Sequence, residues 1–186
     1  MIDRSETLRL VFVAVISASL AACSTGVPAS GGDPTFTPTS QQQVQDTVVE
    51  MYRETLDKLP PGYAFDGSRY SSTGNTVDCD DNATNDHLSP VRYSSYRDMK
   101  VPDGIPVEGL VEKLGTIWKS LGWSVDERDG FPEPNRFATA PDGYSIHAIV
   151  GRPDGYPPAL VAGSACFDGK LADKNIQVPA VLRSNE

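Results

Sequence analysis

The 186-residue chain contains only two histidines, His87 and His147, and this scarcity narrows the chemistry that it can perform. A serine or cysteine nucleophile needs a base beside it, and an imidazole is the usual one. The sequence also lacks the Gly-x-Ser-x-Gly, His-Glu-x-x-His and glycine-rich phosphate-loop motifs of common enzyme classes. We therefore expect that the protein is not an enzyme.

Positive charge is scarce as well: 16 Lys and Arg stand against 25 Asp and Glu, for a net charge of −9. The charged side chains of residues 1–22 cancel, so the excess negative charge belongs to the rest of the chain. An acidic domain is repelled by phosphate backbones and by anionic lipid head groups. We expect no nucleic-acid partner and no affinity of the domain itself for a membrane surface.

The sequence has no apolar run long enough to cross a bilayer, which takes about 20 residues. Its longest such run, Leu10 to Ala22, has the length of the apolar region of a signal peptide. The alternative is a buried N-terminal helix. The run ends Leu20-Ala21-Ala22-Cys23, and small residues before a cysteine at this point are typical of a lipobox. The pattern predicts that the Cys23 sulfur carries a diacylglycerol group and that cleavage makes Cys23 the N-terminus.

This interpretation divides the chain into three parts. Residues 1–22 form a lipoprotein signal peptide, and residues 23–40 form the lipidated cysteine and a flexible tether rich in Gly, Pro, Ser and Thr. Residues 41–186 form a single α+β domain, in which we expect residues 168–186 to be an irregular tail.

Cysteine is rare: besides Cys23 only Cys79 and Cys166 are present. Two cysteines in an exported protein most simply form one disulfide, and the alternative is a free thiol or a metal site. Around Cys79, oxygen-bearing side chains recur at alternate positions, as they do in a calcium loop. Ala83 and Ser89 stand where such a loop needs glycine and glutamate, so a solvated acidic loop is favoured and we expect no metal. The weak metal candidates are Asp78, Asp80, Asn82 and Asp86.

Two segments have helical periodicity. Residues 41–59 carry an apolar stripe after Ser40, which can cap the helix together with Gln43. Residues 106–121 have a wide apolar face and are followed by Gly122, which suits a left-handed C-terminal cap.

Strand-like alternation and turn residues fill most of the remainder. Two Pro-Asp-Gly-Tyr turns twelve residues apart indicate an antiparallel meander. The expected order α-β-α-β-β-β predicts an α+β fold with two helices on one face of a roughly four-stranded antiparallel sheet and one disulfide. Strands are expected at residues 91–97, 123–128, 136–140, 144–151 and 160–167, with a short edge strand at 63–66.

The chain resembles the small Lpp-type lipoproteins of mycobacteria and related actinobacteria, whose function is uncharacterised. The resemblance rests on the Leu-Ala-Ala-Cys lipobox, the Thr/Pro/Gly tether, Leu59-Pro60-Pro61-Gly62, and Trp118-x-x-Leu121-Gly122-Trp123, with Pro141-Asp142-Gly143-Tyr144 and Cys166-Phe167. It implies a cell-membrane lipoprotein in which Cys23 bears an N-acyl chain such as palmitate and the diacylglycerol, on the extracytoplasmic side. It implies no catalytic residues and no cofactor besides these covalent lipids.

These features predict a lipid-anchored, non-catalytic interaction or binding module whose partners are the membrane, through its anchor, and an unknown envelope protein. The alternative is a carrier that holds a lipid or another apolar small ligand between the helices and the sheet. Stripes of Leu, Val and Trp serve cores and pockets alike, so the sequence does not separate these two functions.

Overall fold

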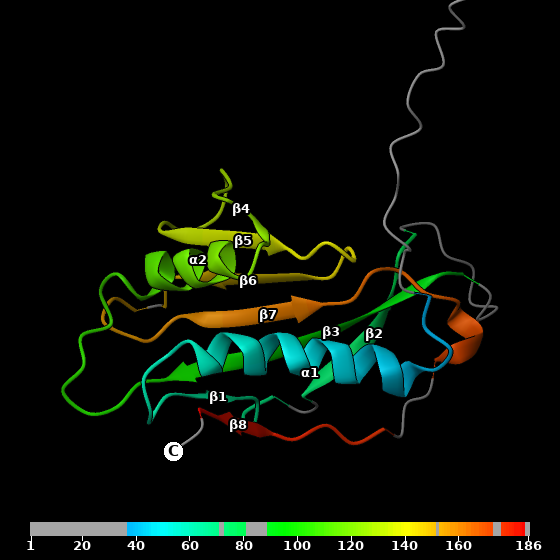
Figure 1. Ribbon diagram of the computed structural model, residues 1–186, viewed down its shortest axis with the longest axis horizontal. Helices are drawn as coiled ribbons and strands as arrows, with labels where there is room; N and C mark the ends of the chain where they lie inside the picture. The colour runs from blue at the N-terminus through cyan, green and yellow to red at the C-terminus, as the bar shows by residue number, and fades with distance from the viewer. Residues whose placement is uncertain (1–36, 71–72, 81–88, 152, 173–175, 185–186) are drawn as a thin grey trace, which may run out of the picture. The chain divides into compact units, whose positions relative to one another are not determined.

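The computed structural model describes residues 37–70, 73–80, 89–151, 153–172 and 176–184. Within them, two α-helices lie on one side of an eight-stranded antiparallel sheet (Figure 1). The predicted α+β class, with two helices on one face, is therefore confirmed. The predicted number of strands, about four, is wrong.

The helices are α1 (Gln41–Asp57) and α2 (Leu110–Ser120), and one 3-10 turn spans Gly169–Leu171. The strands run in the order β4-β5-β6-β7-β3-β1-β8, and β2 pairs with β3 beside this path. Their bounds are β1 (Ala64–Asp66), β2 (Gly74–Asp78), β3 (Val91–Lys100), β4 (Ser124–Asp126), β5 (Asn135–Thr139), β6 (Ser145–Ile149), β7 (Ala159–Gly163) and β8 (Val181–Arg183).

Helix α1 begins where the sequence predicts. The Ser40 side chain accepts a hydrogen bond from Gln43 N at 3.2 Å, which satisfies a backbone donor of the first turn. The Gln43 side chain reaches back to Thr39 N at 3.0 Å, one residue before the expected partner of a capping box.

Helix α2 is shorter than predicted, because it begins at Leu110 and not at Pro106. Gly109 has a φ of +73°, a left-handed conformation that interrupts the helical path. The C-terminal end follows the prediction: Gly122 N bonds Lys119 O at 3.0 Å and Trp123 N bonds Trp118 O at 3.1 Å. These two bonds form a Schellman motif.

Strand β3 is the longest strand and organises the sheet. Along one edge it pairs with β7, and along the other it pairs first with β2 and then with β1. Strand β1 is consequently internal, between β3 and β8, and is not the edge strand that we expected. Strands β2 and β8 were not predicted, and β8 lies in the segment expected to be irregular.

Two polar contacts from α1 hold the helices and the sheet together. The buried Tyr52 hydroxyl donates to Ser95 O at 2.8 Å and accepts from Ala162 N at 3.0 Å, and these two residues are paired across β3 and β7. One turn later, Thr55 Oγ1 accepts from Trp118 Nε1 of α2 at 3.0 Å. Burial raises the pKa of Tyr52 well above its usual value, so its hydroxyl stays protonated.

The predicted disulfide between Cys79 and Cys166 is present. Cys79 follows β2, which pairs with residues 91–95 of β3, and Cys166 follows β7, which pairs with residues 94–98 along the other edge of β3. The bond therefore joins the two neighbours of β3 at the end where β3 begins.

Replacing Tyr52 with phenylalanine tests the contact between α1 and the sheet. Tyr52→Phe removes the partner of Ser95 O and Ala162 N, and we expect it to lower the free energy of unfolding by about 1–3 kcal/mol. Urea unfolding followed by the fluorescence of the buried tryptophans measures this change. Tyr156→Phe is the matched control, because Tyr156 is 61% exposed. Equal stability of the two variants would contradict the role given to the Tyr52 hydroxyl.

Candidate functional site

The sheet face opposite the helices carries a line of apolar and aromatic side chains. Tyr96, Val161, His147 and Phe137 are successive cross-strand partners on β3, β7, β6 and β5. Partners in an antiparallel sheet project to the same face, so these four side chains lie side by side across the sheet. The helix-facing neighbours, such as Ala162 and Ile146, are fully buried in the core.

Aromatic side chains from loops extend this line at both ends. The Tyr70 ring lies 5.9 Å from the Tyr96 ring, and the Phe131 ring lies 4.9 Å from the Phe137 ring. Tyr96 is 36% exposed and Phe131 is 44% exposed, among the few large apolar side chains of the described residues that face solvent. We call this set the open-face row: Tyr70, Tyr96, Val161, His147, Phe137 and Phe131.

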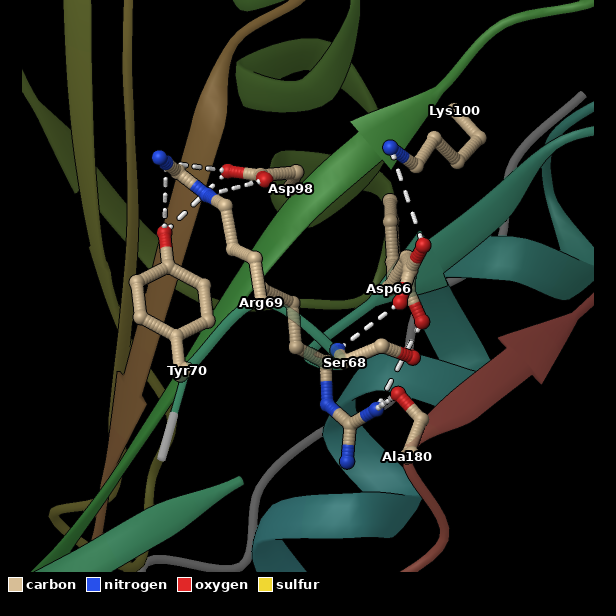
Figure 2. A network of polar contacts seen from close by, with 9 residues as sticks. Asp66, Ser68, Arg69, Tyr70, Asp98, Lys100 and Ala180 are labelled. Carbon is tan, nitrogen blue, oxygen red and sulfur yellow. Dashed lines mark hydrogen bonds and ion pairs between the residues drawn. The ribbon is translucent and has the colours of Figure 1, made fainter. Parts of the chain in front are cut away.

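Charged side chains border the open-face row near β3. Arg69 forms an ion pair and a hydrogen bond with Asp98, and it also donates to the Tyr70 hydroxyl at 2.9 Å (Figure 2). The Tyr70 hydroxyl donates to Asp98 at 3.1 Å. Burial and the neighbouring Asp98 carboxylate raise the pKa of Tyr70, so this hydroxyl remains a hydrogen-bond donor at neutral pH.

A second ion pair lies further along the same border, between Lys100 and Asp66 at 3.6 Å (Figure 2). The Asp66 carboxylate also accepts from Ser68 N at 2.8 Å. Hydrogen bonding from Ser68, first through its side chain and then through its backbone, is the main reason why the pKa of Asp66 is lowered. The cations near this border are thus paired, which suits contact with a mixed polar surface better than contact with a polyanion.

A groove opens beside the row, with a volume of about 780 Å³. The paired Arg69 and Asp98 line it, together with Tyr156 and Pro157. Ile149 from β6 also lines it. The groove and the row together make an apolar strip with a charged border, the composition expected of a contact surface.

His147 occupies the middle of the row and has an unusual environment. Its ring stacks on Phe137 with a centroid separation of 4.7 Å, and the Arg128 guanidinium lies 4.3 Å from the Phe137 ring centre. Burial, and to a lesser extent the Arg128 charge, lowers the pKa of His147 to about 4. The imidazole is therefore neutral at physiological pH.

The residues predicted as sites fall in different places. Cys23, Asn82, Asp86 and His87 lie outside the described residues. Asp78 ends β2 and Asp80 follows the disulfide-bonded Cys79, and both are exposed. Within the part of the chain that the structure describes, no three His, Cys, Asp or Glu side chains gather as metal ligands.

The open-face row was not predicted from the sequence as a site. Alternation in residues 91–97 and 144–151 did place Tyr96 and His147 on the opposite face from neighbours such as Tyr93 and Ile146. The neighbour relations between β3, β7, β6 and β5 were missing, and these relations place the side chains in one line.

Comparison of the chain with known protein families, with characterised proteins and with solved structures found no match. In the described residues, neither helix is long and apolar enough to span a bilayer.

The low pKa of His147 predicts a specific dependence of stability on pH. The folded pKa is about 4 and that of a free imidazole is about 6.5, so the unfolded chain binds more protons between these values. Stability should therefore fall as the pH drops from 6.5 to 4, with about 1–3 kcal/mol due to this group after allowance for its partial exposure.

His147→Phe keeps an aromatic ring beside Phe137 and cannot titrate. We expect the difference in unfolding free energy between the wild type and His147→Phe to change across this pH range and to be constant above pH 7. Parallel pH profiles for the two proteins would show that the pKa of His147 is not depressed.

Proposed function

We propose that the protein is a lipid-anchored, non-catalytic binding module on the extracytoplasmic face of the cell membrane. In this proposal, the open-face row contacts another component of the envelope. The lipobox ending at Cys23 supports the anchor, and the tether of residues 24–40 separates the domain from the head groups.

The observation that carries the proposal is that, among the residues that the structure describes, helices cover one face of the sheet and not the other. Helices α1 and α2 lie over one face of the sheet (Figure 1). On the other face no helix of the described residues covers the row, and Tyr96 and Phe131 are 36% and 44% exposed. The Tyr96 and Phe131 side chains contact water in the monomer, and a partner that covered them would bury their apolar surface. Aromatic side chains are also enriched where protein partners bind.

The environment of His147 supports a non-catalytic role. Its ring stacks on Phe137, and no hydrogen bond links it to a serine, cysteine or carboxylate of the described residues. A general base must lie within hydrogen-bond reach of the group whose proton it accepts.

The packing between helices and sheet favours an interaction module over an apolar carrier. Val44, Val48 and Leu114 from the helices and Leu160 and Ile146 from the sheet are all fully buried against one another. An apolar ligand in this layer would have to displace core side chains, whereas a partner on the open face displaces only water.

Photo-crosslinking in native membranes tests the interaction surface. A benzophenone amino acid at position 96 or 131 of the full chain should give a defined crosslinked product, because these side chains lie on the open face. The same probe at Arg53, an exposed residue of α1, is the matched control and should give none. Crosslinking only from position 53, or from none of the three, would refute the open face as the contact surface.

Cys23→Ala tests the anchor separately. It should abolish labelling by a fatty-acid analogue and move the protein from the membrane fraction to the soluble fraction, since the domain needs its acyl chains for stable anchoring. The label is the decisive readout, because an uncleaved leader could retain the chain at the membrane without lipid. Persistent labelling of Cys23→Ala would refute the lipobox.

A further inference from the structure

A second cavity lies on the helix side of the sheet, and Tyr70 is the one residue that it shares with the open-face row. It has a volume of about 520 Å³ and is bounded by the start of α1, by β2 and by residues 176–180. It occurs where β1 and β2 part: β2 pairs with β3 up to Ser95, and β1 pairs from Asp98 onward. The turn after β1, including Gly67 and Ser68, closes this gap.

We call this cavity the polar pocket, and the residues that line it have a distinctive composition. None of the described side chains that line it carries a formal charge. Its polar groups are amides and hydroxyls, which can both donate and accept hydrogen bonds. The amides come from Gln41, Gln45, Asn75 and Gln177, and Tyr93 contributes a phenol.

Two of these groups are buried without a partner. Gln45 Oε1 and Tyr93 Oη make no hydrogen bond of good geometry, although the residues are only 3% and 1% exposed. The Ser95 and Thr73 side chains lie close enough to the phenol to offset part of the rise in the pKa of Tyr93 that burial causes. The Ser95 hydroxyl, on the same strand face, donates instead to Thr73 O at 2.7 Å. Native proteins rarely leave buried polar atoms unpaired, so such atoms facing a cavity indicate a missing partner.

The surrounding structure keeps the pocket open. An added Cβ at Gly74 would stand 2.6 Å from Ser94 O and would overlap the Tyr93 side chain. Any residue other than glycine at this position would therefore displace the Tyr93 phenol. The buried Arg97 guanidinium donates to Ala180 O at 2.9 Å and to Pro179 O at 2.8 Å, which holds the far wall. Figure 2 shows Ala180 at this position beside Asp66 and Ser68.

We propose that this pocket binds a neutral, hydroxyl-rich ligand of the size of a mono- or disaccharide. Sugar hydroxyls both donate and accept, and they therefore match amide and phenol groups better than a carboxylate or an ammonium does. The volume lies within the range of small-ligand sites. Neither of the cations nearby lines the pocket: Arg69 is paired with Asp98, and the terminal nitrogens of Arg97 are bonded to backbone carbonyls. Arg97 Nε is buried without a partner but belongs to a side chain outside the lining, so the lining itself offers an anion no charge.

Calorimetric titration of the full chain in detergent micelles tests this site. The probes are glucose, galactose, mannose, arabinose and trehalose, with glucuronate as the anionic counterpart. We expect saturable binding of at least one neutral sugar, with a Kd of roughly 10 μM to 1 mM. Tyr93→Phe and Gln45→Met should each weaken it at least tenfold, because each leaves a sugar hydroxyl unpaired.

Stability measurements separate binding from folding. Without sugar, Tyr93→Phe should be about as stable as the wild type, since it deletes a hydroxyl that makes no hydrogen bond of good geometry. Tyr156→Phe should bind as the wild type does. The proposal is overturned if no neutral sugar binds, which would mean that only water occupies the pocket, if glucuronate alone binds, or if Tyr93→Phe binds unchanged.

Discussion

The hydroxyl of Tyr52 is the contact on which the arrangement of this domain depends. It is buried and bonded to Ser95 O and Ala162 N, one cross-strand pair of β3 and β7. This places the middle of α1 over the centre of the sheet, and Thr55 then fixes α2 through Trp118. Because α1 is held at its middle, its first turns extend over β2, where Gln41 and Gln45 reach the polar pocket.

Alternation along β3 then divides the candidate functions between two faces. Tyr93, Ser95 and Arg97 point toward the helices and take part in the pocket, its surroundings or the core, whereas Tyr96 and Asp98 point to the open face. A strand repeats its side-chain direction every two residues, so neighbouring residues of one strand serve separate surfaces. Tyr70 is the one member of the open-face row that also lines the pocket, so a ligand in the pocket and a partner on the row would share this side chain alone.

The sequence predicted those features that depend on local patterns. Ser40 caps α1 and Gly122 ends α2 as expected, because caps are set by neighbouring residues. Strands β2 and β8 escaped prediction because their stability comes from pairing with β3 and β1, residues far away in the chain. The open-face row was not predicted for the same reason. The alternation that separates Tyr96 from its neighbours is a local pattern, but the alignment of Tyr96 with Val161 and His147 depends on pairing between distant strands. The unpaired atoms of Gln45 and Tyr93 are likewise a property of the folded surroundings alone.

Two buried amides show how this fold separates stability from recognition. Asn135 is fully buried and satisfied, since it bonds Arg128 N at 2.9 Å, Arg128 O at 3.0 Å and Pro132 O at 3.4 Å. It thereby holds the loop that carries Phe131 onto the open-face row. Gln45 is almost as deeply buried, yet its acceptor is unpaired. The desolvation cost of such an atom is tolerated only where other contacts compensate, and the bonds made by Tyr52 two turns further along α1 provide that compensation. The unpaired Gln45 amide oxygen can then remain available for a ligand without destabilising the fold.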